Sequence, residues 1–405
     1  MERVKYLILG AGPAGLTFAR KLMDRGENSF LVLEKEKSAG GLCRSVEVDD
    51  SPLDIGGGHF LDVRRPAVND FLFRFLPREE WKFFERDSRI AIAGKLIGHP
   101  FEANIWQLDP DSQVEYLTSI AKAGCNSGEP MPERFVDWIK WKLGERIAED
   151  YMLPYNQKMF ADDLDHLGTY WLEKLPNVSY EETLRSCLNH RPYGEQPGHA
   201  SFYYPVKYGY GEVWLRMAGS IEGHILYEKD VYGINIEKRE VLVHPFEVYH
   251  ADNIITTIPW PVFTDISGMP KELVEDLGQL KTSAVEIRYV PEHLETEAHW
   301  IYVPAPEIPY HRILIRYNFC QGSKGYWLET RQERTHYYKD DNYHYLNQYA
   351  YPLNTIGKPG IMEKVLEYTK ERHVYGLGRW GEHSHYNSDL VVERAIRLEE
   401  ELSNQ

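Results

Sequence analysis

The chain has 405 residues, 42% of them apolar, which is enough for one large domain or two to three modest ones, and a formal net charge of −16. This acidic balance argues against nucleic acid or an anionic membrane surface as a partner. No run of about 18 apolar residues predicts a transmembrane helix, and the first residues do not resemble a signal peptide. Four scattered cysteines form neither a metal motif nor a disulfide framework. We therefore expect a cytoplasmic protein without a metal site that binds a small molecule; the oligomeric state stays open.

The first element in chain order is an apolar strand that runs into a glycine turn. After residues 6–9, Gly10, Gly12 and Gly15 follow the GxGxxG spacing, and residues 16–23 continue as a helix. Gly10 permits the tight turn, Gly12 lets the backbone approach a pyrophosphate, and Gly15 lets the helix lie close to the sheet. The N–H groups at the start of such a helix attract an anion.

A second apolar strand, residues 30–33, supports this interpretation because it ends in Glu34. A carboxylate at this distance from the glycine turn accepts a hydrogen bond from a ribose hydroxyl. The pattern therefore predicts a dinucleotide site of the Rossmann type. An ordinary glycine turn is the alternative.

Two further glycine clusters follow. Gly40 and Gly41 come directly after the predicted ribose-binding acid, where a backbone free of side chains can approach a ligand. Residues 56–58 are three consecutive glycines, and His59 follows them where its ring could meet a cofactor. A surface turn at the first cluster and a satisfied loop histidine at the second are the alternatives.

The remaining pattern predicts an interrupted nucleotide-binding domain. We expect a hairpin at 88–101, a helical segment over 104–165, strands within 224–258 and 282–318, and helices near 360–371 and 389–402. The predicted fold is α/β. Its Rossmann-like domain uses residues 1–100, 200–260 and 360–405, with a helical insertion at 104–190 and an antiparallel sheet domain at 265–350.

Several motifs, in chain order, resemble those of the flavin-dependent UDP-galactopyranose mutases, which belong with the amine oxidases and protoporphyrinogen oxidase. The glycine turn with Glu34 and Gly40-Gly41 marks the larger group. The mutase branch is indicated by Gly57-Gly58-His59-Phe60, Gly94 to Pro100, Tyr155 to Phe160, Pro205 to Tyr210, Pro309 to Ile313, Tyr351-Pro352-Leu353 and Gly378-Arg379-Trp380-Gly381 with Asp389. Phe160 replaces the family's tryptophan, Asp62 a second histidine, and His385 a tyrosine.

The resemblance implies FAD as the cofactor, kept reduced by an external electron donor, with flavin N5 as the nucleophile in a nucleotide-sugar pyranose–furanose isomerisation. It implies catalytic roles for Arg312 and Arg379, which would clamp a diphosphate, and for His59, which would orient the flavin. Substrate contacts are implied for Tyr155, Phe160, Tyr317, Tyr351, His385 and Tyr386. Cofactor contacts are implied for Gly10, Gly12, Pro13, Ala14, Gly15, Glu34, Lys35, Gly40, Gly41, Leu42, Gly57, Gly58, His59, Val231, Gly378, Arg379, Asn387, Ser388 and Asp389.

Other interpretations stay open. Arg312 and Arg379 can be ordinary ion pairs, and Asn387 or Ser388 can simply cap the last helix. An FAD-dependent oxidoreductase acting on an amine, a CH–CH bond or a sugar would share the cofactor motifs without needing two arginines. A non-catalytic binder resembling the Rab-escort proteins is the third class, and the intact glycine turn with Glu34 argues against it.

Overall fold

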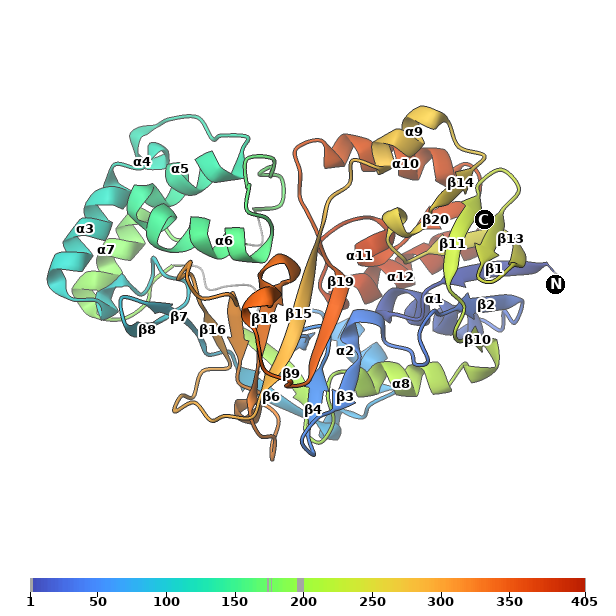
Figure 1. Cartoon of the computed structure of the whole chain (residues 1–405), viewed down its shortest axis with the longest axis horizontal. Coiled ribbons are helices and arrows are strands. Elements are labelled where there is room, and N and C mark those ends of the chain that lie inside the picture. Colours follow the sequence, from blue (N-terminus) through green and yellow to red (C-terminus); the bar gives the residue numbers. More distant parts are fainter. Residues whose placement is uncertain (1–2, 173–174, 176, 195–199, 405) are drawn as a thin grey trace.

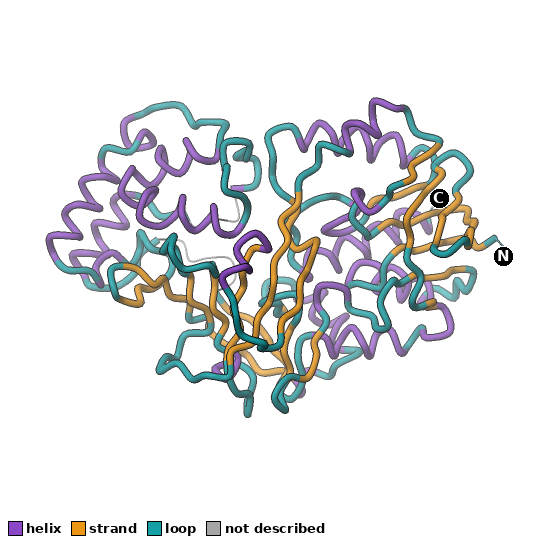
Figure 2. The backbone as a smooth tube through the Cα atoms, viewed as in Figure 1, coloured by secondary structure: helices purple, strands orange, loops and turns teal. Residues whose placement is uncertain are grey.

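The computed structural model of the chain describes residues 3–172, 175, 177–194 and 200–404. A helical lobe lies on one side and an α/β lobe with both termini on the other, with a second sheet between them (Figure 1). Helices make up most of the first lobe and flank the strands of the other (Figure 2). None of the helices within the described ranges is long and apolar enough to cross a membrane.

The sheet of the α/β lobe confirms the predicted α/β class. Its order is β10 (Ile225–Leu226), β2 (Phe30–Leu33), β1 (Val4–Leu9), β13 (Glu247–Thr256), β12 (Glu240–Val243), β11 (Val231–Asn235) and β14 (Asp265–Ser267), and β20 (Val374–Gly376) also pairs with β13. β10, β2, β1, β13 and β20 pair in parallel, whereas β13, β12 and β11 form an antiparallel meander.

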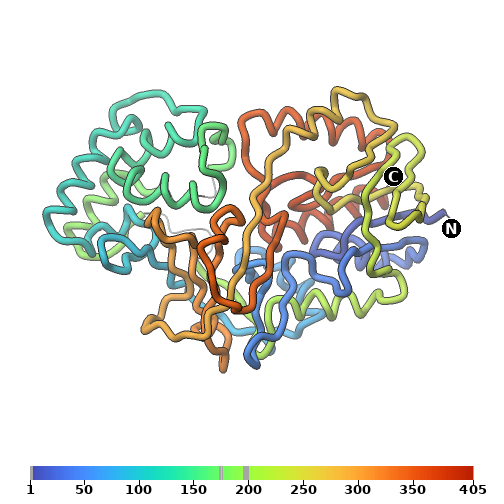
Figure 3. Tube along the Cα trace, viewed as in Figure 1, coloured from blue at the N-terminus to red at the C-terminus, as the bar shows by residue number. Residues whose placement is uncertain are grey.

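Both faces of this sheet are covered, which explains why residues 6–9 of β1 form a continuous run of apolar and aromatic residues. Successive side chains point to opposite faces: Tyr6 and Ile8 join one core cluster, and Leu7 and Leu9 join another. The first cluster includes residues of α1 (Pro13–Asp24), α8 (Gly211–Gly219) and α12 (Ser388–Ser403), and the second includes residues of α9 (Lys271–Leu277) and α10 (Lys358–Lys370). The N-terminal and C-terminal segments therefore lie side by side in this lobe (Figure 3).

The second sheet has the order β19 (His344–Pro352), β15 (Thr282–Val290), β18 (Tyr326–Arg331), β17 (Arg312–Leu314), β16 (Trp300–Tyr302), β7 (Ser88–Ile92) and β8 (Lys95–Gly98). The predicted hairpin forms, but its assignment to the nucleotide-binding segment 1–100 is wrong. β7 pairs in parallel with β16, so that Trp300 is the partner of Ser88. Pairing over this sequence distance cannot be deduced from the local alternation that predicted the hairpin.

The helical lobe contains α3 (Pro110–Ala121), α4 (Gly124–Ser127), α5 (Phe135–Ile147), α6 (Leu153–Met159) and α7 (Tyr180–Asn189), with a π-helical turn at Ala148–Met152. Shorter elements complete the described chain: α2 (Pro66–Phe73), α11 (Gly378–Gly381), the pair β3 (Ser45–Glu47) and β4 (Pro52–Asp54), and the small sheet β5 (Leu61–Asp62), β9 (Ser201–Pro205) and β6 (Trp81–Glu85). Short 3-10 turns lie at Gly41–Cys43, Arg78–Glu80, Ile105–Gln107, Glu222–His224, Trp260–Val262, Arg316–Asn318 and Gln332–Tyr337.

The last strand within the segment 282–318, where strands are predicted, already ends at Leu314. Residues Arg316–Asn318 form a 3-10 turn because the Arg316 side chain, fully buried, turns towards the β3–β4 hairpin. Its guanidinium donates to the carbonyl oxygens of Val48 at 3.0 Å, Pro52 at 2.8 Å and Lys324 at 2.6 Å. A buried cation satisfied by carbonyls costs less than an unpaired one, and this tertiary contact overrides the apolar alternation.

Candidate functional site

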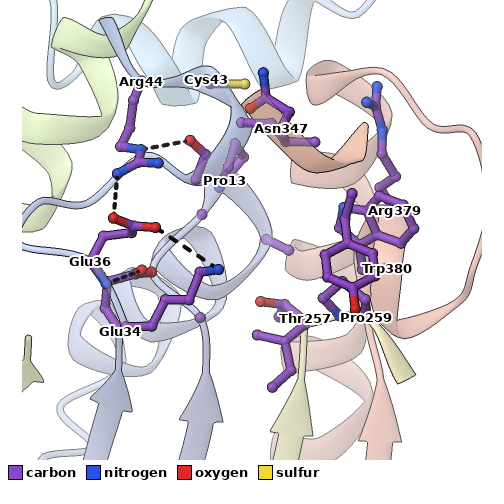
Figure 4. Close-up of a pocket in the computed structure, with 18 of the residues that line it drawn as sticks. Pro13, Glu34, Glu36, Cys43, Arg44, Thr257, Pro259, Asn347, Arg379 and Trp380 are labelled. Carbon is purple, nitrogen blue, oxygen red and sulfur yellow. Dashed lines mark hydrogen bonds and ion pairs between the residues drawn. The ribbon is translucent and has the colours of Figure 1, made fainter. Parts of the chain in front are cut away.

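A cavity of about 520 Å³, here called cavity A, opens at the carboxyl ends of β1 and β2. The glycine turn and Glu34 form one wall, and β19 residues with Arg379 and Trp380 form the other. Figure 4 shows Glu34, Glu36 and Arg44 facing Arg379 and Trp380 across this space. Among the predicted cofactor contacts, it is lined by Gly10, Gly12, Pro13, Ala14, Glu34, Lys35, Gly41, Leu42, His59, Val231, Arg379 and Ser388.

The three glycines of the turn have different surroundings. Gly10 has a φ of +99°, a left-handed conformation that disfavours a side chain. A Cβ atom on Gly15 would lie 2.0 Å from the Gly10 carbonyl oxygen, so helix α1 can pack here only with glycine. A Cβ on Gly12 would meet nothing closer than the Gly41 Cα at 3.7 Å. It would instead occupy cavity A, so Gly12 keeps space open for a ligand rather than for the protein.

Glu34, the predicted ribose-binding residue, lies at one end of cavity A. It is buried, and its carboxylate accepts from the backbone N–H groups of Ala11 at 2.7 Å and Glu36 at 2.9 Å. Burial raises the pKa of Glu34, and the two N–H donors act in the opposite direction. Arg44 closes this end of cavity A through the Glu36 carboxylate at 3.3 Å and the Gly41 carbonyl at 3.1 Å.

A second cavity of about 300 Å³, cavity B, adjoins the first. His59, Arg379 and Ser388 line both cavities. Its wall is rich in aromatic side chains, and it includes the predicted substrate residues Tyr155, Phe160, Tyr351 and His385, together with Gly58, Arg312, Asn387 and Asp389. Tyr386 lines cavity A instead. The structure therefore brings most of the predicted substrate residues together beside the predicted cofactor residues.

At the junction, the His59 ring keeps an unused polar atom. Its buried Nε2 has no hydrogen-bond partner among the described residues. The pKa of His59 is lowered to about 3, mainly by burial and to a smaller extent by the Arg379 cation. The ring is therefore neutral at pH 7. A bound group with a polar edge would satisfy this nitrogen, since a buried polar atom without a partner is costly.

Arg379 is the second distinctive group at the junction. Its guanidinium donates to the carbonyl oxygens of Tyr386 at 2.9 and 3.1 Å and of Ala350 at 3.1 Å. Within the described part of the chain, no carboxylate lies within ion-pair distance of it. Burial lowers the pKa of Arg379, although an arginine stays charged at pH 7. Two carbonyls hold this cation in place and leave its charge available to an anion.

Arg312 differs from the expectation of a free clamp. It donates through Nε to Glu329 at 2.8 Å and through Nη2 to the same carboxylate, which faces it across the β17–β18 register. Glu329 is buried and also accepts from the Gly58 N–H at 3.1 Å. Arg312 reaches the Tyr351 hydroxyl at 3.2 Å. Its charge is already matched by a carboxylate, so it is a weaker anion ligand than Arg379.

Some predicted residues lie elsewhere or are already engaged. Tyr317 lines neither cavity: its hydroxyl bonds to the backbone of Leu294 at 2.8 and 2.9 Å, which corrects its expected substrate role. Asp389 is paired with Arg65 at 2.7 Å. Asn387 occupies the N-cap position of α12 without a side-chain capping bond. Four of the predicted glycines line neither cavity: Gly15, Gly40, Gly57 and Gly378. The last three have a positive φ, and the first lies where a Cβ atom would meet backbone.

The sequence analysis missed Arg44, Arg86 and Glu329. Arg44 directly follows a glycine pair expected to face a ligand, and this position could have drawn attention to it. Arg86 lies in the short connection between β6 and β7, and Glu329 lies on β18. Neither segment carries a motif, and only the tertiary structure shows where these residues lie.

Comparisons with known proteins agree with this geometry. Residues 8–75 match the family model of the NAD(P)-binding Rossmann-like domain, which confirms the predicted dinucleotide type of cofactor site. The uncharacterized protein in the nifH2 3' region of Methanothermococcus thermolithotrophicus is 33% identical over 103 residues, which are 25% of this chain and 98% of that protein.

Two solved structures share the whole architecture. Reduced UDP-galactopyranose mutase aligns with a TM-score of 0.87 and 21% identity over 100% of this chain and 94% of that one. A putative protoporphyrinogen oxidase from Exiguobacterium sp. 255-15 aligns with a TM-score of 0.70 and 15% identity over 100% of both chains. At these identities the similarity shows that the fold is shared.

Proposed function

We propose that the chain is an FAD-dependent nucleotide-sugar mutase that resembles UDP-galactopyranose mutase. FAD would bind in cavity A, with its ribose at Glu34 and its pyrophosphate over Gly12 at the start of α1. The space beyond Gly12 and the unpartnered Nε2 of His59 support this fit. The fold shared with the reduced mutase supports the reaction class.

The observation that carries the proposal is the charge of Arg379 at the junction of the two cavities. In a chain with a net charge of −16, an arginine that no described carboxylate neutralises favours an anionic ligand at this point. A diphosphate that leaves and returns during an isomerisation needs such a fixed cation. Preorganised donors of this kind stabilise developing charge without reorganising during the reaction.

In the proposed reaction, the residues that line the two cavities bind and orient the cofactor and the substrate. When bound, reduced FAD would supply the nucleophile that reacts with the sugar. Arg379 holds the diphosphate beside the anomeric carbon. Tyr155 and Phe160 pack on the nucleotide base, and the Tyr351 hydroxyl, fixed by Arg312, donates to a phosphate oxygen. His59, neutral at pH 7, orients the cofactor edge without adding positive charge. The aromatic side chains of cavity B would shield the reacting group from water.

The test is isomerisation by the reduced holoprotein. Dithionite-reduced protein is incubated with UDP-, dTDP- and GDP-hexoses, and the products are separated by chromatography. Pyranose–furanose exchange without net oxidation supports the mutase. The oxidised protein serves as the control, because it should be inactive. Net oxidation of a substrate, with no exchange in any reduced sample, would contradict the proposal.

One observation favours a second candidate, an FAD-dependent oxidoreductase of the amine oxidase or protoporphyrinogen oxidase type. Glu329 neutralises Arg312, so one of the two expected diphosphate ligands is already engaged. A hydride-transfer enzyme with this fold does not need two free arginines. Aerobic turnover of an amine or a CH–CH substrate, measured as hydrogen peroxide release, would favour this alternative.

A further inference from the structure

A second arginine of cavity B has no acidic partner. The Arg86 guanidinium donates through Nε to the Ser88 hydroxyl at 2.7 Å and through Nη2 to the Tyr302 hydroxyl. No carboxylate of a described residue lies within ion-pair distance of it. The adjacent Asp87 pairs with Arg89 instead, at 2.5 Å. Arg86 is therefore a positioned cation whose charge is not matched.

The surroundings of Arg86 fix its orientation. Its guanidinium lies 4.7 Å from the centroid of the Trp300 ring, a distance at which a cation interacts with an aromatic face. Nη1 has no hydrogen-bond partner among the described residues. The Tyr302 hydroxyl accepts from Nη2, so its own proton is available to a ligand. Nη1 of Arg86, which lies just before β7, and the hydroxyl of Tyr302, which lies on β16, are thus two donors held next to each other.

Arg86 lines the same cavity as the glycine loop that contains Gly58 and His59. A single indole separates it from the glycine loop: a Cβ on Gly58 would be 3.1 Å from the Trp300 Nε1. The next residue in that loop, His59, lines both cavities. A ligand that extends from the junction into cavity B can therefore contact both His59 and Arg86.

We propose that Arg86 and the Tyr302 hydroxyl form a second anion-binding position, which takes a carboxylate on the reacting, sugar-like part of the substrate. The identity of the rest of the ligand rests on the proposed function. With Arg379 assigned to the diphosphate, two separate unmatched cations in one cavity fit a ligand with two separate anionic groups. Charge-assisted hydrogen bonds to arginine are among the strongest polar contacts in proteins.

The test compares two ligands that differ only at C6 of the sugar. Binding of UDP, UDP-galactose and UDP-galacturonate to the FAD-saturated protein is measured by titration calorimetry. We expect the wild type to bind UDP-galacturonate about 10- to 100-fold more tightly than UDP-galactose. Arg86→Gln should abolish this preference and leave the affinity for UDP within about twofold. Tyr302→Phe, which removes only the hydroxyl, should reduce the preference in part.

The matched control is Arg89→Gln, which removes a nearby cation on β7. Arg89 pairs with Asp87 and does not line cavity B. It should leave all three affinities unchanged. A wild type without preference for the carboxylate would overturn the proposal. So would an Arg86→Gln protein that loses affinity for UDP as strongly as for UDP-galacturonate, because Arg86 would then be a phosphate ligand.

Failure of the nucleotide-sugar function gives a different result. If UDP shows no binding to the wild type, the proposed function is contradicted, and free galacturonate and galactose then test Arg86 alone. Galacturonate binding that Arg86→Gln abolishes would support the carboxylate position. Galacturonate binding that is absent, or that Arg86→Gln leaves unchanged, would overturn it.

Discussion

Removing the charge of Glu329 tests how much its buried ion pair with Arg312 contributes to the free energy of unfolding. Burial by itself would raise the pKa of Glu329, but the Arg312 guanidinium and His311 outweigh it and hold the value at about 2 instead of 4.5. At about 1.4 kcal/mol per pH unit, this difference corresponds to about 3 kcal/mol of folding free energy. Glu329→Gln should therefore lower the free energy of unfolding by about 3 kcal/mol.

The assay is urea denaturation at pH 7 with FAD in constant excess, followed by tryptophan fluorescence. Because the folded pKa of Glu329 lies below the unfolded value, its contribution is complete above pH 4.5 and is lost as the pH falls from 4.5 towards 2. The wild type should therefore lose stability over this range more steeply than Glu329→Gln. Removing both charges, in Arg312→Met/Glu329→Gln, should restore part of the loss, because no charge remains buried without a partner.

A ligand provides a second readout. In Glu329→Gln, Arg312 lacks its carboxylate and can be neutralised by a diphosphate, so UDP should raise the denaturation midpoint more than in the wild type. A mainly structural role for Glu329 would produce the opposite, a weaker effect of UDP. A Glu329→Gln protein within about 0.5 kcal/mol of the wild type would refute the reasoning.

Three further predictions concern the two cavities and the buried histidines. Gly12→Ala should fold with an unchanged melting temperature of the apoprotein but should lose FAD binding. Gly15→Ala should instead lower the melting temperature of the apoprotein, because its Cβ would meet the Gly10 carbonyl oxygen. Equal melting temperatures of the two apoproteins would contradict this prediction. Arg379→Ala should keep FAD and its absorbance spectrum but bind UDP about 10- to 150-fold more weakly, and Arg379→Lys should recover part of the loss; unchanged affinity would remove Arg379 from the site. Burial, and to a smaller extent Arg86, lowers the pKa of His99 to about 3. As the pH falls below 6.5, the unfolded chain therefore takes up a proton before the folded one, and the free energy of unfolding should decline. Urea midpoints measured from pH 7 to 4 should decline less steeply in His99→Gln, and an unchanged pH dependence would contradict the lowered pKa of His99.

Local signals predicted the nucleotide-binding part of the molecule. The strand Phe30–Leu33 has the predicted limits, and the glycine turn and Glu34 meet at one cavity, because each of these features depends on neighbours within about 35 residues. The predicted substrate residues depend on the resemblance, and the structure groups most of them in cavity B. Their functional roles remain predictions.

The charge state of the site could not be predicted in the same way. Whether an arginine is free depends on its partner in space, and Glu329 faces Arg312 only through the β17–β18 pairing. Arg86 and Arg379 are alike in lacking a described acidic partner, but only Arg379 belongs to a motif. Arg316 illustrates the same limit for the backbone, since its contacts with the β3–β4 hairpin end a strand that the alternation had extended.

The long-range pairing of both sheets has a consequence for how the chain folds during synthesis. Leu9 on the central strand β1 pairs with Thr256, and Ser88 on β7 pairs with Trp300. Neither sheet can be completed until most of the polypeptide has left the ribosome, so the helical lobe, built from consecutive residues, is the part that can form early. High sequence separation of contacts slows folding and prolongs exposure of unpaired strand edges. One edge of the apolar strand β1 can pair early with β2, but its other edge stays unpaired until β13 has been synthesised, and this edge therefore needs protection from aggregation in the nascent chain.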